Sequence, residues 1–272
     1  IGLYLLFVLA RELRKKQPIR TVITAGIVLA VFSLGPLIPW TIRNFRVFHR
    51  FQPLTSRYAT GPEDFVPLGF NHWVKTWMAE YVSVEDIYWQ EPGAKIDPDN
   101  LPRRAFDSFE QKQETLEALN WYNENTEIEP ELDAQFEVIA KERIAHSRFR
   151  YYVWLPFLRI ADMWLRPRTE LLPPDPRWWE FTDDLKWMAL SLGLGLINLA
   201  YLGMAVGGIV HVARAPRSAD SRLPAYLGVL ILFVLMRSAF LGTLENPEPR
   251  YTLECYPAVI VCAAALFRER SV

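Results

Sequence analysis

The residues of this chain best suited to chemistry are arginines at the ends of apolar runs. Arg43 belongs to the stretch Pro39-Trp40-Thr41-Ile42-Arg43-Asn44, which follows the apolar run from Thr21 to Ile38. Proline interrupts a helix, tryptophan favours the level of the lipid headgroups, and arginine places a fixed cation at the membrane edge. We therefore expect the first helix to end at Pro39, with Arg43 on a stiff turn beside it.

A second arginine lies in the stretch Glu245-Asn246-Pro247-Glu248-Pro249-Arg250-Tyr251, just before the last apolar run. A guanidinium group stays charged and binds phosphate oxygens through two parallel hydrogen bonds. Arg43 and Arg250, each on a proline-stiffened turn at a membrane edge, predict a site for an anionic ligand that is attached to a lipid. Their neighbours Asn44 and Tyr251 are suited to orient such a ligand or, equally, to cap the ends of helices.

Each of the two arginines also has a structural interpretation. Arg43 could be a membrane anchor whose long side chain extends to the headgroups. Arg250 could be the ion-pair partner of Glu245 or Glu248. The residue pattern leaves both interpretations open.

Arg237 lies inside an apolar run, next to Ser238. A charged side chain at the centre of a bilayer costs roughly 2.5 kcal/mol or more, so it should face a cavity or a partner. We favour an internal ion pair with Glu254 as the explanation of Arg237. A role in orienting a ligand is the alternative.

The composition describes a chain in which apolar spans flank a sizeable aqueous segment. Hydrophobic residues make up 51% and charged residues 22% of the chain, a mixture that differs from both a uniform membrane bundle and a soluble domain. The net charge of -1 gives no reason to expect nucleic-acid binding. Cys255 and Cys262 share a helix face and are interpreted as buried small residues. The histidines show no ligand spacing, so we predict no metal site, and we predict no cofactor.

Four apolar runs are long enough to cross a bilayer, provided that the last one buries its polar start against other helices. They are Thr21 to Trp40, Leu185 to Val212, Leu223 to Leu241 and Thr252 to Phe267. Ile1 to Ala10 is too short to cross and is interpreted as the end of a further span. Because the chain begins inside this run without a methionine, we expect it to be a fragment of a longer protein.

Basic residues orient the spans, because cytoplasmic loops carry an excess of lysine and arginine. They cluster in connections that would all be cytoplasmic: Arg11, Arg14, Lys15, Lys16, Arg20, Arg214, Arg217, Arg222, Arg268 and Arg270. We predict transmembrane segments in residues 1–44, an extracytoplasmic, mostly helical domain in residues 45–184, and transmembrane segments in residues 185–272. The predicted fold class is mainly α, an integral membrane helical bundle with a helical extracytoplasmic domain inserted between spans.

The outer segment has helical patterns of its own at Phe70 to Val82, Arg104 to Asn125 and Pro130 to His146. A further pattern, Phe149 to Leu165, interleaves aromatic residues with arginines. This composition is typical of a helix that lies in the membrane interface, and an amphipathic core helix is the alternative. We favour the interfacial interpretation, because three tryptophans follow just before or within the next span: Trp178, Trp179 and Trp187.

Three stretches of the chain resemble motifs of bacterial glycosyltransferases. Pro39-Trp40-Thr41-Ile42-Arg43-Asn44, with Phe45-Arg46-Val47-Phe48 after it, is similar to a motif of multi-spanning enzymes that use polyprenyl-phosphate sugars. Glu248-Pro249-Arg250-Tyr251-Thr252 resembles their late motif, and Ala161-Asp162-Met163-Trp164-Leu165-Arg166-Pro167-Arg168 also resembles sequence of this group. The group is the GT-C superfamily, which includes protein O-mannosyltransferases and the lipid A aminoarabinose transferase.

The resemblance implies that the chain is the C-terminal part of such a glycosyltransferase in the bacterial inner membrane. It implies the inverting transfer of a sugar from a polyprenyl-phosphate donor to an acceptor on the outer face. The family's catalytic aspartate would lie upstream of this chain, so no catalytic residue is assigned. Arg43 and Arg250 would bind the donor phosphate, and Asn44, Tyr251 and Arg237 would orient the substrate.

The alternative function is that of a non-enzymatic membrane protein, either a transport component or an assembly factor whose outer domain binds a partner. A transporter should show broken spans with polar residues at the midplane, or paired repeats. Apart from Arg237, the sequence shows neither. An outer loop with acidic residues upstream of the chain would favour the enzyme, and a soluble domain there would favour the alternative.

Overall fold

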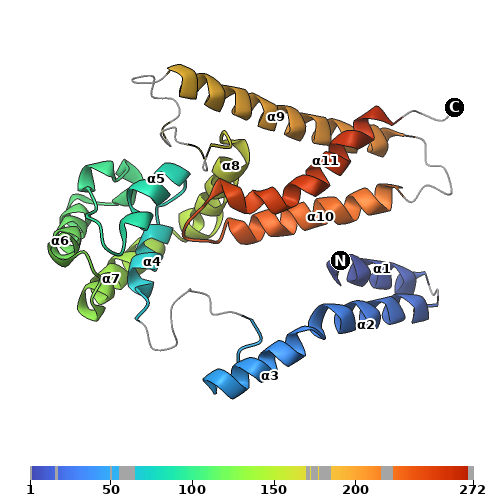
Figure 1. The fold of residues 1–272 in the computed structure, drawn as a ribbon, viewed down its shortest axis with the longest axis horizontal. Helices are drawn as coiled ribbons and strands as arrows, with labels where there is room; N and C mark the ends of the chain where they lie inside the picture. Colours follow the sequence, from blue (N-terminus) through green and yellow to red (C-terminus); the bar gives the residue numbers. More distant parts are fainter. Residues whose placement is uncertain are drawn as a thin grey trace. The chain divides into compact units, whose positions relative to one another are not determined.

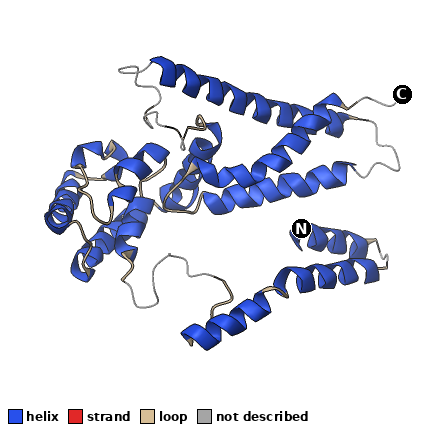
Figure 2. Cartoon of the chain, in the orientation of Figure 1, coloured by secondary structure: helices blue, strands red, loops and turns tan. Residues whose placement is uncertain are grey.

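The computed structural model describes residues 2–15, 18–49, 51–54, 65–169, 172, 177, 185–215 and 223–268. Within these ranges all regular secondary structure is helical (Figures 1 and 2). The chain divides into two compact units, Ile1–Val66 and Pro67–Val272. Some residues that support the predicted orientation and interfacial helix lie outside the described residues: Lys16, Trp178, Trp179, Arg217, Arg222 and Arg270.

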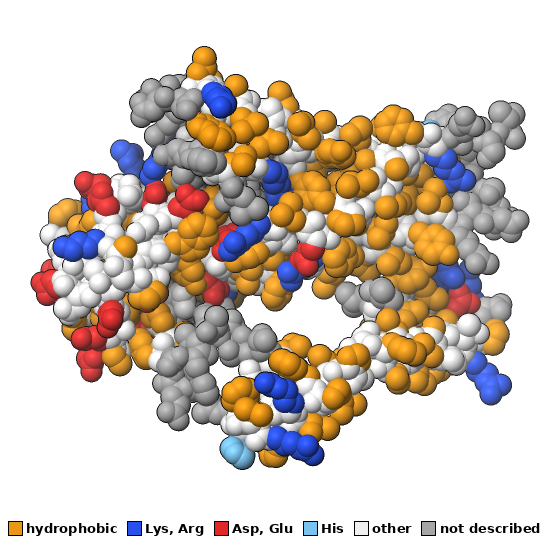
Figure 3. Space-filling view, in the orientation of Figure 1, with side chains coloured by type: hydrophobic (Ala, Val, Ile, Leu, Met, Phe, Trp, Pro, Cys, Tyr) orange, Lys and Arg blue, Asp and Glu red, His pale blue; other side chains and the backbone are white. Residues whose placement is uncertain are grey.

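Four helical stretches of the described residues are long and apolar enough to span a membrane: Arg20–Phe48, Leu185–Arg214, Leu223–Leu241 and Pro249–Phe267. The prediction of a mainly α fold with four candidate spans is therefore confirmed. In the second unit, hydrophobic side chains cover the surface of the spans, whereas acidic side chains gather over the helices at the other end (Figure 3). The side of the membrane on which each loop lies stays a prediction.

The described residues of the first unit form three helices: α1 (Gly2–Arg14), α2 (Arg20–Leu34) and α3 (Leu37–Phe48). The expectation that Pro39 ends a helix is wrong. Pro39 is the third residue of α3, in the first turn, where a proline removes no intrahelical hydrogen bond. The chain is interrupted earlier, at Gly35 and Pro36, which separate α2 from α3. Arg43 consequently lies within a helix and not on a turn.

The C-terminal spans are α9 (Leu185–Arg214), α10 (Leu223–Leu241) and a composite span made of the 3-10 helix η5 (Pro249–Cys255), α11 (Tyr256–Ala264) and the 3-10 turn η6 (Ala265–Phe267). α11 packs along α9 (Figure 1), where a Cβ atom on Gly208 would lie 2.0 Å from the carbonyl oxygen of Cys262. Small residues permit this close packing of membrane helices. Cys255 and Cys262 are free and buried, as the sequence predicts.

An apolar core lies among four shorter helices: α4 (Leu68–Lys75), α5 (Tyr81–Asp86), α6 (Phe109–Asn125) and α7 (Pro130–His146). Three 3-10 turns connect them: η1 (Tyr88–Gln90), η2 (Pro98–Asn100) and η3 (Arg103–Ala105). Trp73, Trp77 and Phe136 are completely buried in this core. Gly69 allows α4 to approach α7, because a Cβ atom there would lie 2.0 Å from the carbonyl oxygen of Asp133.

Two predicted helices of this region have different bounds in the structure. The pattern from residue 70 to 82 is interrupted between α4 and α5, and carbonyl groups of the interruption accept hydrogen bonds from arginine side chains instead of from helix N–H groups. Trp77 accepts from Arg104 and Met78 accepts from Arg159. The helix expected from Arg104 begins at Phe109, because the Ser108 hydroxyl caps it by accepting a hydrogen bond from the Gln111 N–H at 3.1 Å.

A helical run over residues 148–165 leads from α7 towards the spans. It contains a π-helical segment, η4 (Arg150–Trp154), followed by α8 (Leu155–Leu165). α8 packs against α10 and η5, and it lies between the helices α4–α7 and the spans (Figure 1). Trp164 donates a hydrogen bond from Nε1 to Ser238 of α10 at 2.9 Å. The position of this run at a membrane surface stays a prediction.

The arginines of this run do not share one role. Arg150 forms a two-pronged ion pair with Asp107, at 2.5 and 2.7 Å. Arg159 is completely buried and Arg166 is 6% exposed. Of the arginines at positions 148, 150, 159 and 166, Arg148 alone is exposed. Most of the cations that suggest an interfacial helix therefore bind other parts of the protein.

Candidate functional site

The polar stretch before the last span folds around one buried carboxylate, that of Glu248. This side chain is 2% exposed. Its Oε1 accepts hydrogen bonds from the Tyr251 hydroxyl at 2.7 Å and from the Asn246 amide at 3.2 Å. Its Oε2 lies 2.5 Å from Nε of Arg250. The structural interpretation of Arg250, an ion pair with Glu248, is therefore correct.

The ion pair leaves part of the Arg250 guanidinium group accessible. Glu248 engages Nε, while 48% of the Arg250 side chain is exposed. An arginine fixed through Nε presents its two Nη atoms as a planar fork, the arrangement that binds phosphate in a bidentate way. The nearby carboxylate offsets part of the positive charge, so anion binding here depends on this directional geometry more than on net charge. The ion pair and an anion-binding role are thus compatible.

Arg168 connects this stretch to the end of α8. Its guanidinium group donates hydrogen bonds to the carbonyl oxygen of Pro249 at 2.6 Å, to the Thr252 hydroxyl at 2.7 Å and to the Tyr256 hydroxyl at 2.9 Å. The same guanidinium carbon lies 5.0 Å from the centre of the Tyr256 ring. Arg168 therefore holds η5, and with it Arg250, against the segment that follows α8.

A polar contact inside the spans continues from Arg168. The Tyr256 hydroxyl donates a hydrogen bond to Oδ1 of Asn198, on α9, and the Asn198 amide donates to the carbonyl oxygen of Trp164 at 2.7 Å. Trp164 in turn stacks on Tyr256, with ring centres 5.9 Å apart. Buried polar groups in an apolar bundle need such partners. The network fixes α8, α9 and α11 relative to one another.

Arg237 pairs with Glu254 of η5, as the sequence predicts. Its guanidinium carbon also lies 5.2 Å from the ring centre of Phe240. The pair gives this charge, within a candidate span, the partner that an apolar environment requires. A role for Arg237 in orienting a substrate stays a prediction.

Arg43 and Asn44 form a local arrangement on α3, in the first unit. The Arg43 Nη1 donates to Oδ1 of Asn44 at 3.2 Å, and the guanidinium carbon lies 5.3 Å from the ring centre of Trp40. Asn44 is 3% exposed and donates to the carbonyl oxygen of Gln52 at 2.8 Å. Asn44 therefore ties the end of α3 to the segment after it. The convergence of Arg43 with Arg250 stays a prediction.

Asp162, on α8, positions the helical region around α5. Its carboxylate accepts a hydrogen bond from the Tyr81 N–H, at the first residue of α5, at 3.0 Å. Burial raises the pKa of Asp162 from its ordinary value of 3.8 to about 6, although the nearby Arg166 cation acts in the opposite direction. The side chain serves as a capping acceptor for a helix that supplies none of its own.

The chain matches no family model, and no curated protein or solved structure matches it either. Its functional interpretation therefore depends on its own residues and on the resemblance of three short stretches.

The residue types point to Arg250 and Tyr251 but not to the residues that fix them. The sequence suggests Glu248 as an ion-pair partner of Arg250, and it assigns no role to Arg168 or Asn198. A polar residue such as Asn198 within the glycine-rich apolar run from Leu185 to Val212 is nevertheless a signal of a buried contact.

Proposed function

We propose that this chain is the C-terminal part of a GT-C membrane glycosyltransferase that transfers a sugar from a polyprenyl-phosphate donor. In this proposal the stretch around Arg250 binds the donor phosphate at the outer face of the bacterial inner membrane. The catalytic aspartate belongs to a segment upstream of this chain. The acceptor and the sugar remain open.

One observation carries the proposal. Two of the three stretches that resemble GT-C sequence, the one ending at Arg168 and the one containing Arg250, lie far apart in the chain and contact each other through two hydrogen bonds, from Arg168 to Pro249 and Thr252. Motifs that meet in space are expected of parts of one site, whereas chance matches of short motifs have no reason to meet. The third stretch, around Arg43, belongs to the first unit, and its convergence on the same site is part of the proposal.

A half-exposed arginine that a buried carboxylate holds in place is suited to sugar transfer from a prenyl phosphate. When the bond between sugar and phosphate breaks, negative charge increases on the departing prenyl phosphate. A cation already oriented towards that phosphate stabilises the transition state without reorganisation. The role of Glu248 in this scheme is to fix Nε of Arg250, and the role of Tyr251 is to complete the hydrogen bonds of Glu248.

Sugar transfer by the full-length protein tests the proposal. Arg250→Lys keeps the charge but loses the planar fork, so turnover should fall. Arg250→Ala removes the cation and should reduce turnover by roughly 100-fold or more. Arg103→Ala, which changes an exposed arginine in η3, is the matched control and should retain wild-type turnover. Wild-type turnover in well-folded Arg250→Ala would reduce this residue to a membrane anchor or ion-pair partner.

A further inference from the structure

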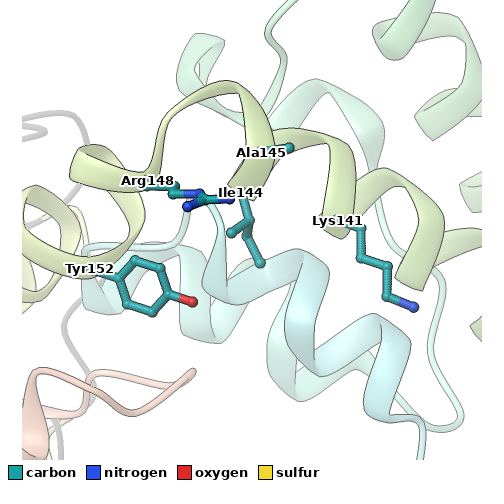
Figure 4. Close-up of a pocket in the computed structure, with 5 residues that line it drawn as sticks. All are labelled: Lys141, Ile144, Ala145, Arg148 and Tyr152. Carbon is teal, nitrogen blue, oxygen red and sulfur yellow. The ribbon is translucent and has the colours of Figure 1, made fainter.

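An open pocket of about 320 Å³ lies where α7 ends and the helical run over residues 148–165 begins. Five residues line it: Lys141, Ile144, Ala145, Arg148 and Tyr152 (Figure 4). Lys141 and Tyr152 lie on opposite sides of Ile144 in this view. The pocket thus has an apolar floor, two cationic side chains and one phenol, and it is separate from the site around Arg250.

The cations of the pocket differ in how much they are already engaged. Arg148 is exposed and forms neither a hydrogen bond nor an ion pair with another described residue. The Tyr152 side chain is 65% exposed, and its hydroxyl likewise has no hydrogen-bond partner within the described part of the chain. Lys141 pairs with Glu137 at 3.2 Å, while 72% of its side chain stays exposed. Arg148 therefore provides most of the attraction for an anion, and Lys141 adds to it.

A new stretch of helix begins beside the pocket. A new helical run starts at residue 148, after Ser147 leaves the α7 conformation. The Ser147 hydroxyl accepts the Arg150 N–H at 3.4 Å, and the Ser147 carbonyl accepts the Tyr151 N–H at 3.2 Å. The start of a helix carries partial positive charge and favours anions. The run continues as a π-helical segment, a geometry that occurs frequently at functional sites.

An exposed apolar face adjoins the pocket. The side chains concerned are large and between 49% and 67% exposed: Phe149, Tyr152, Val153, Trp154 and Phe157. The same helical run packs against α10, which is long and apolar enough to cross a membrane. The helical run that carries this face therefore contacts a candidate membrane span. Aromatic residues next to cations are typical of the level at which headgroups meet acyl chains.

We propose that this pocket binds the phosphate of an anionic phospholipid from the bilayer that the spans cross. Arg148 and the Tyr152 hydroxyl bind the phosphate oxygens, Lys141 contributes charge, and the adjoining aromatic face contacts the acyl chains. The exposed apolar face, on a run that contacts the candidate span α10, favours a lipid over a soluble anion. The inference depends on membrane insertion and not on sugar transfer.

Lipid retention by the purified full-length protein tests this inference. The protein is titrated in detergent with phosphatidylglycerol or phosphatidylcholine, and bound lipids are counted by native mass spectrometry. Wild type should retain phosphatidylglycerol in preference to phosphatidylcholine. Arg148→Ala should bind phosphatidylglycerol roughly tenfold more weakly, because it loses a charge-assisted contact. Tyr152→Phe should show a smaller loss, and Arg103→Ala should behave as wild type.

Several outcomes would overturn the inference. Equal retention of the two lipids by wild type, or unchanged retention in both Arg148→Ala and Tyr152→Phe, would show that the pocket is not a headgroup site. Displacement of the lipid by millimolar inorganic phosphate would assign the pocket to a small soluble anion. If Arg148→Ala fails to fold, Tyr152→Phe alone decides between these outcomes, since it removes only one oxygen atom.

Discussion

Replacing Arg159 by methionine should weaken the attachment of helices α4–α7 to the spans. Arg159 is completely buried, and its guanidinium group donates hydrogen bonds to the carbonyl oxygens of Lys75, Met78 and Gly242. Lys75 is the last residue of α4 and Met78 lies in the segment after it, whereas Gly242 follows α10, so one side chain joins both regions. Methionine is similar in length but has no donor, and it leaves three carbonyl groups without this partner.

Two opposing contributions determine the size of this effect. Hydrogen bonds from a charged group contribute about 1.5–3 kcal/mol each to stability, or about 5–9 kcal/mol for three. Burial of the guanidinium group costs free energy, and it lowers the pKa of Arg159 to about 10, a shift that corresponds to about 3 kcal/mol. The net loss on replacement is therefore about 2–6 kcal/mol, similar to the effect of breaking a buried ion pair.

Thermal unfolding in detergent micelles, followed by tryptophan fluorescence, measures this loss. For a unit of this size, 1 kcal/mol shifts the Tm by roughly 2–4 °C, so Arg159→Met should lower it by roughly 5–20 °C. Arg148→Met changes an exposed arginine of the same helical run and is the matched control, with an expected shift below roughly 2 °C. Equal shifts in the two variants would refute the reasoning.

Three further predictions concern stability. Asp162→Asn should raise the free energy of unfolding by about 3 kcal/mol at pH 8 and by less than about 1 kcal/mol at pH 4. Burial raises the pKa of this carboxyl from 3.8 to about 6, so within this window the folded protein holds a proton that the unfolded chain releases. An equal gain at both pH values, in unfolding curves, would contradict this prediction. Gly208→Ala should lower the Tm, since its Cβ would lie 2.0 Å from the Cys262 carbonyl oxygen and push α9 from α11; an unchanged Tm would exclude this contact. Glu254→Gln should destabilise the protein by roughly 1 kcal/mol or more, because Arg237 loses its ion-pair partner. Adding Arg237→Leu to this variant should restore stability. A double variant that is less stable than Glu254→Gln alone would count against the pairing.

Much of the helical architecture could be predicted from local pattern. Pro130 at a first-turn position and the charges after it predict α7 with the bounds that the structure has, and the apolar run of α10 also has the predicted bounds. These elements are determined by residues within a few turns of each other. The pairing of Arg237 with Glu254 was also predictable, because a charge inside an apolar run requires a partner and few are within reach.

The elements that were predicted wrongly depend on more distant or subtler relations. Pro39 interrupts a helix only if it lies beyond the first turn, and the local sequence does not show that the interruption falls at Gly35. The helix expected over residues 70–82 is broken where Arg104 and Arg159 bind its carbonyl groups. Local periodicity cannot show such partners, because each comes from another part of the chain.

The candidate site was predictable in composition but not in arrangement. The type of residue and its place beside an apolar run pointed to Arg250. The fixing of its Nε by Glu248, and the attachment of η5 to the end of α8 through Arg168, come from the fold. An arginine side chain with several donors can reach many acceptors, and only the folded chain selects among them.

Donor cleavage by the full-length protein in lipid nanodiscs tests the central proposal most directly. Polyprenyl-phosphate sugars with different sugars are supplied with a membrane extract as acceptor, and free polyprenyl phosphate is measured by mass spectrometry. We predict that one of these donors is consumed, with one polyprenyl phosphate released for each sugar transferred, and that Arg250→Ala slows this release. A well-folded wild-type protein that neither binds nor cleaves any of the donors would contradict the proposal and favour a non-enzymatic membrane function.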